Sequence, residues 1–157
     1  MRKTIIDSVS EVIPLQQDNW LDVESLARVE ISSEEAAHPI ESALIPGRGP
    51  GWRAAQPGKQ TVRVVFDRPL KLTRIRLRFD EREQARTQEF ALRWLAAGQK
   101  DFREIFRQQY TFSPPGTIEE VEDYHVELQG VIAVELNIVP EISGGSARAS
   151  LAQISLA

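Results

Sequence analysis

Short runs of alternating apolar and polar residues fill most of this chain, and their period of two limits the folds that the chain can adopt. In "QTVRVVF" the side chains of Val62, Val64 and Phe66 share one face of an extended backbone. The same spacing recurs in "ARVEISS", "RIRLRF", "EFALRWL", "FREIFRQQYTFS", "DYHVELQG", "VIAVELNIVP" and "ASLAQISLA". Because successive side chains of a strand point to opposite faces, the eight runs predict eight half-buried β-strands.

Turn residues separate these runs at 67–69, 98–100, 113–116, 129–130 and 143–146. Many short strands without intervening helices are typical of an all-β, antiparallel β-sandwich of the jelly-roll type. Only "PLQQDNWLDVESLA" and "SEEAAHPIESAL" favour helix, and the second begins at Ser33 with acidic residues in its first turn. We therefore expect one domain over residues 1–157, with one or two short helices near its N-terminus and residues 1–25 packed on it as an extension.

Charge is unevenly distributed along the chain. The net charge of -4 argues against nucleic acid as a partner, because phosphate binding depends on accumulated positive charge. Fifteen of the nineteen basic residues are arginine, and twelve of these lie between Arg48 and Arg107. Two interpretations of this basic middle stay open: solvated strand faces, or guanidinium groups chosen for bidentate recognition of anions.

Several classes of function are excluded or disfavoured by residue type. The chain has no cysteine, and its two histidines, His38 and His125, lack a metal-ligand spacing, so we expect no metal and no cofactor. Acidic pairs such as Glu34-Glu35 and Glu119-Glu120 are interpreted as solvated charge, and we expect no enzyme. Polar residues interrupt the apolar residues after the basic start, and no run approaches the roughly 20 apolar residues of a membrane span. We predict a cytoplasmic protein without a membrane partner.

A Trp-Arg pair stands just before the strand that contains Val62, in "GWRAAQPGKQ". Either Trp52 closes one end of the core, or Arg53 is held there to meet a ligand. We interpret "GWRAAQPG" itself as a loop that leads into this strand.

The order of several motifs identifies a resemblance. "ISS", "HPIESAL", "GWRAA", "QTVRVVFDRPLKLTRIRL" and "ASLAQISL" follow one another over residues 26–157. In this order they resemble the galactose-binding-like superfamily, which includes discoidin (coagulation factor 5/8 type C) domains and related carbohydrate-binding modules. The resemblance implies that Trp52 packs at the end of the core. It also implies that Arg53, Arg86 and Gln88 converge on a ligand cleft at the strand ends, with Arg82 as the rival to Arg86.

Two departures from the superfamily pattern change the expected ligand. The loop "EISGGSARAS" lacks the aromatic residue on which sugar-binding members stack their ligand, and Arg148 takes the nearest equivalent position. The loop "SALIPGRGPG" has no carboxylate to bind the calcium ion of many relatives. The resemblance therefore implies a non-catalytic module for a carbohydrate or a small anionic ligand, with Arg107 at the flank of the cleft. A protein-interaction module is the alternative. No acid lies within two positions of Arg53, Arg86 or Arg148, so we expect their guanidinium groups to be unpaired.

Overall fold

The computed structural model describes residues 20–157, which contain eight strands and two short helices. The expected extension 1–25 and the expected helical stretch at 14–27 lie partly outside the described residues. The strands are β1 (Ala27–Ile31), β2 (Trp52–Pro57), β3 (Gln60–Asp80), β4 (Arg86–Ala96), β5 (Arg103–Phe112), β6 (Glu119–Val139), β7 (Arg148–Leu151) and β8 (Gln153–Leu156), and the helices are α1 (Val23–Leu26) and α2 (Glu41–Leu44).

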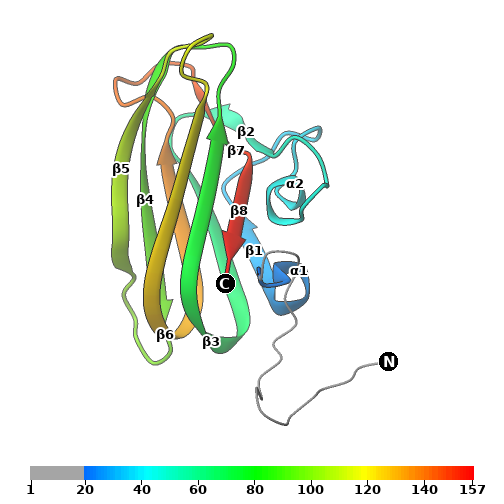
Figure 1. Ribbon diagram of the computed structural model, residues 1–157, viewed down its shortest axis with the longest axis vertical. Coiled ribbons are helices and arrows are strands. Elements are labelled where there is room, and N and C mark those ends of the chain that lie inside the picture. Colours follow the sequence, from blue (N-terminus) through cyan, green and yellow to red (C-terminus); the bar gives the residue numbers. More distant parts are fainter. Residues whose placement is uncertain (1–19) are drawn as a thin grey trace.

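Antiparallel pairing builds two layers that face each other, as Figure 1 shows. One layer has the order β1, the first half of β3, the second half of β6, β4 and β5. The other layer consists of β8, the second half of β3 and the first half of β6. The strands β2 and β7 form a separate pair at one end. This arrangement confirms the predicted antiparallel β-sandwich.

The strands β3 and β6 each belong to both layers. Turns were expected at 67–69 and 129–130, but the pairing of β3 with β6 continues past both positions. The register of this pairing shifts in three steps between Val65 and Arg74 of β3. Figure 1 shows both strands folding over at the lower end of the sandwich. Pro69, which has no backbone N–H, and Gly130, with φ of 64°, lie at these bends. The sequence therefore predicts four separate strands where the structure has two long, bent ones.

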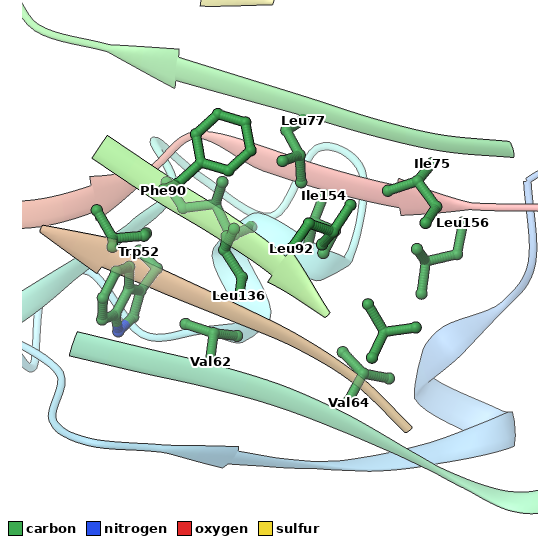
Figure 2. Close-up of a cluster of buried hydrophobic side chains, with 14 of the residues drawn as sticks. Trp52, Val62, Val64, Ile75, Leu77, Phe90, Leu92, Leu136, Ile154 and Leu156 are labelled. Atoms are coloured by element: carbon green, nitrogen blue, oxygen red, sulfur yellow. The ribbon is translucent and has the colours of Figure 1, made fainter. Parts of the chain in front are cut away.

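The core lies between the two layers and follows the period of two. Val62, Val64 and Leu136 of the first layer face Leu77 and Ile154 of the second, as the close-up in Figure 2 shows. Alternate residues of β3 are buried from Gln60 to Phe66, which is the expected face. Trp52 closes one end of this core with only 1% of its surface exposed, so its predicted packing role is confirmed.

Two local predictions near the N-terminus need correction. The stretch 33–44 is helical only at its end, in α2, because Pro39 disfavours helical backbone at His38. Ser33 caps no helix and instead donates a 2.7 Å hydrogen bond to Gln60 Oε1. The expected loop "GWRAAQPG" contains β2, whose backbone pairs with β7. No helix among residues 20–157 is long and apolar enough to span a membrane.

Candidate functional site

A cleft of about 260 Å³ opens at the end of the sandwich where β2 and β7 pair. Its walls come from β2 and the loop before it, from the end of β3 and the residues that follow, and from β7 with the residue after it. The lining residues are His38, Pro50, Trp52, Arg53, Asp80, Glu81, Arg82, Glu83, Arg148, Ser150, Leu151 and Ala152. Three arginines and three carboxylates therefore surround the cleft.

Gly51 allows the two strands beneath the cleft to approach each other. Its φ is 108°, and a Cβ atom there would lie 2.6 Å from the carbonyl oxygen of Leu151. Such a contact is too close for any other residue without a shift of the backbone. The glycine of the "GWRAA" motif thus positions Arg53 beside β7.

Arg53 and Arg148 meet at this cleft, as the resemblance implies, but they are not unpaired. Arg148 Nη1 lies 2.8 Å from Glu35 Oε1, and Arg53 Nε lies 3.5 Å from the same oxygen. His38 Nδ1 is 3.2 Å from the other oxygen, Oε2. Burial alone would raise the pKa of Glu35, but the hydrogen bond from Arg148 and the charges of Arg53 and His38 lower it overall. The expectation that the guanidinium groups of Arg53 and Arg148 are unpaired is therefore wrong, because their partner Glu35 lies far from both in the sequence.

Arg86 and Gln88 lie beneath the cleft rather than in it. The side chain of Arg86 has no exposed surface, and its Nε lies 2.7 Å from Glu81 Oε1. Its Nη1 donates to the carbonyl oxygen of Pro140 at 2.9 Å, and its guanidinium stacks over Phe112. Gln88 is fully buried. Neither side chain lines the cleft, and Arg86 is ion-paired, so the expectation that it is unpaired is wrong too.

Arg107 lies outside this cleft. It projects from β5 and pairs with Glu104 and Glu89 at 2.8 and 2.7 Å. It lines a different hollow, together with Lys59 and Asn137. By contrast Arg82, the rival to Arg86 in the sequence, does line the cleft.

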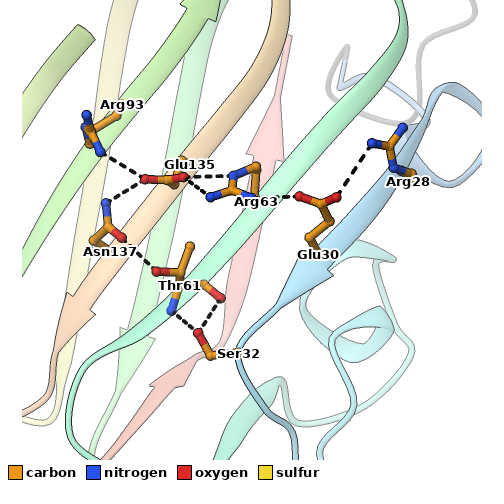
Figure 3. A network of polar contacts seen from close by, with 8 residues as sticks. All are labelled: Arg28, Glu30, Ser32, Thr61, Arg63, Arg93, Glu135 and Asn137. Carbon is orange, nitrogen blue, oxygen red and sulfur yellow. Dashed lines mark hydrogen bonds and ion pairs between the residues drawn. The ribbon is translucent and has the colours of Figure 1, made fainter. Parts of the chain in front are cut away.

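Most of the remaining arginines belong to strand faces. Figure 3 shows Arg63 of β3 between Glu30 of β1 and Glu135 of β6, with Arg93 of β4 on the other side of Glu135. On the opposite layer Arg74 forms two hydrogen bonds with Asp123 across the strands, at 2.9 and 2.7 Å. These contacts support the interpretation of the basic middle as paired strand faces.

The carboxylates that organise the site were not among the predicted site residues. Glu34 and Glu35 are not simply solvated, since Glu34 Oε2 accepts the N–H of Ile40 at 2.9 Å and Glu35 holds Arg148. Glu120 is also not solvated, because only 1% of its surface is exposed. Nothing in the sequence points to these partners, since Glu35 and Arg148 are 113 residues apart. His125 is exposed, as predicted.

Comparison with known proteins identifies the fold. No family model and no curated protein sequence matches the chain. Among solved structures, the chain is similar to the family 32 carbohydrate-binding module of NanJ from C. perfringens in complex with galactose. The two sequences are 16% identical, the match covers 85% of this chain and 94% of that chain, and the TM-score is 0.55. The chain has a galactose-binding-like fold.

The same fold occurs in other matching structures. The CBM32 of AlyQ in complex with 4,5-unsaturated mannuronic acid has 11% identity, 84% and 95% coverage and a TM-score of 0.61. The N-terminal domain of the single-strand break repair protein XRCC1 has 14% identity, 83% and 97% coverage and a TM-score of 0.59. At these identities the galactose-binding-like fold is what the proteins share.

Proposed function

We propose that this protein is a non-catalytic binding module that holds a carbohydrate in the cleft beside β2 and β7. The observation that carries the proposal is the carboxylate of Glu35, which two exposed guanidinium groups share at the edge of the cleft. The side chains of Arg53 and Arg148 are 46% and 40% exposed, so both keep N–H groups available to a ligand. Each guanidinium has five N–H donors, and Glu35 uses few of them.

The charge balance of the cleft favours hydroxyl groups as the recognised chemistry. A hydroxyl both donates and accepts, so it can accept from Arg53 and donate to Glu35 at the same time. The lining also contains Arg82 and Arg148 against Asp80, Glu81 and Glu83, which leaves no excess of positive charge. A ligand anion would reach the free N–H groups of both arginines against the negative charge of Glu35.

The apolar part of the lining supports the same class of ligand. Pro50 is exposed at the cleft, and its C–H groups offer a surface against which the apolar face of a sugar ring can pack. Solved neighbours with this fold carry galactose and an unsaturated mannuronic acid, a neutral and an acidic sugar. Both classes of sugar therefore belong in the test.

The test is a glycan array of neutral and acidic sugars, followed by calorimetric titration of any hit. Arg53→Ala and Arg148→Ala should each weaken binding about tenfold or more, the cost of losing a hydrogen bond to a charged donor. Arg107→Ala is the matched control, because Arg107 is an exposed, doubly paired arginine outside the cleft. A hit that all three variants weaken equally, or no hit at all, would overturn the proposal and favour the protein-interaction alternative.

Glu35→Gln tests the preference for a neutral ligand. The amide cannot neutralise Arg53 and Arg148, so binding of a neutral sugar should weaken while sulfate or an acidic sugar should stabilise the variant more than the wild type. Sulfate also stabilises proteins by exclusion from their surfaces, so the comparison is made against Arg107→Ala at matched ionic strength. If the wild type already prefers acidic sugars and Glu35→Gln changes nothing, the cleft recognises anions without displacing Glu35.

A further inference from the structure

A second hollow, of about 370 Å³, lies on the side of the sandwich opposite β5, between α1, β1 and α2. We call it the β1 groove. Its lining includes Val23, Ala27, Val29, Ile31, Leu44 and Ile45. Several of these apolar side chains, among them Val29, Ile31 and Leu44, are only partly buried although they pack against the main core.

The origin of the groove is the unequal width of the two layers. The layer that ends in β1 is broader than the layer of β8, β3 and β6 that faces it. Over β1 the cover comes from α1 and α2, which are only four residues long. The face of β1 that carries Val29 and Ile31 is therefore left incompletely covered.

We propose that the β1 groove is the docking site of this chain's own residues 4–13. The first described residues enter directly beside it, since Trp20 and Leu21 are buried and Val23 lines the groove. Nine residues, 14–22, lie between position 13 and Val23, and an extended chain covers about 3.3 Å per residue. This stretch can span about 30 Å when extended, which is enough for the segment to reach the groove.

The sequence of the segment matches the apolar floor. Ile5, Ile6, Val9, Val12 and Ile13 recur at intervals of three and four, the spacing that places side chains on one face of a helix. Asp7, Ser8, Ser10 and Glu11 fall between them in the sequence. A segment with five aliphatic residues in this spacing thus precedes a groove lined by aliphatic side chains.

The charges of the groove and of the segment are also complementary. Glu24, Glu34 and Glu41 line the groove, and Arg2 and Lys3 directly precede the segment. Glu24 Oε2 lies 3.8 Å from Arg48, and Glu34 accepts the N–H of Ile40, so Glu41 has the most freedom to meet a basic side chain. Attraction between these groups favours one direction of the segment along the groove.

Cross-linking in the full chain tests the proposal. The chain has no cysteine, so a pair of introduced cysteines reports a single contact. Ile6→Cys, Val9→Cys or Val12→Cys is combined with Leu44→Cys, and the control combines each with Val121→Cys, an exposed apolar position on the other layer. Under mild oxidation, at least one Leu44 pair should close within the monomer about tenfold faster than its control. Equal rates would overturn the proposal, and so would a cross-link that forms only between two chains.

A second measurement does not depend on cysteine geometry. In the full chain, Ile5→Asp/Ile6→Asp should increase hydrogen-deuterium exchange in β1 and α2 severalfold and lower the melting temperature, because a carboxylate is costly to bury against the aliphatic lining and is repelled by the glutamates of the groove. Ser8→Asp/Ser10→Asp adds the same charge to the polar positions and should change neither quantity. Equal exchange in wild type and both variants would show that the segment does not cover the groove.

Discussion

Gln88 Nε2 donates a 2.8 Å hydrogen bond to Glu120 Oε1, and this bond joins the two layers of the sandwich in its interior. Gln88 belongs to β4 and Glu120 to the half of β6 in the opposite layer. Arg86 Nη1 in turn donates to Gln88 Oε1 at 3.2 Å, and Arg86 Nε is paired with Glu81 at the cleft. A continuous polar chain therefore runs from the cleft into the core.

Arg86→Ala should destabilise the fold by about 3 kcal/mol, because it leaves Glu81 and Gln88 without their buried partner. Denaturant unfolding measures the loss, with Arg107→Ala as an exposed control that should leave stability nearly unchanged. If Arg86→Ala instead keeps full stability and abolishes ligand binding, Arg86 contacts the ligand directly.

Stability should fall as the pH rises from about 5 to about 8 because of Glu120. Burial, and next the neighbouring carboxyl of Glu122, raise the pKa of Glu120 to about 8, above its ordinary 4.5. Between these two values the folded chain keeps a proton that the unfolded chain has released, so a higher pH favours unfolding. Below the lower value and above the upper one, this residue adds no further dependence on pH.

The control for this pH dependence is Glu120→Gln, a neutral side chain of the same shape. Its free energy of unfolding, measured with denaturant at pH 5, 6, 7 and 8, should be flatter than that of the wild type over the same range. Identical slopes for the two proteins would place the pKa of Glu120 near its ordinary value in the folded state.

Trp52→Ala should cost about 3–5 kcal/mol, the range for truncation of a buried large aromatic side chain. The indole is almost fully buried, and its Nε1 donates to the carbonyl oxygen of Ser33 at 2.9 Å. Arg53→Ala, one position later on the opposite side of β2, should leave the melting temperature nearly unchanged. Similar large losses in both variants would assign Arg53 to the structure and remove it from the ligand site.

Much of the fold could be predicted from local pattern. The period of two in "QTVRVVF" and "RIRLRF" correctly predicts which residues of β3 face the core, because strand geometry alone decides the alternation. The same pattern could not show that β3 continues past Pro69, since pairing through a bend depends on β6, which lies 50 or more residues further along the chain. Pro39 already disfavours helix at His38, but pattern could not predict that Ser33 contacts Gln60 instead of capping a helix, since the two residues belong to different elements.

The candidate site likewise has features that could be predicted from the sequence and features that could not. The strand faces follow from the alternation of the sequence, and the packing role of Trp52 and the arrival of Arg53 and Arg148 at one end of the sandwich follow from the order of its motifs. The pairing of Glu35 with Arg53 and Arg148, and the burial of Arg86 on Glu81, depend on how the chain folds and cannot be predicted from these patterns. A charge acts through space, so the carboxylate that neutralises a guanidinium is its nearest neighbour in the fold, and that neighbour can come from anywhere along the chain.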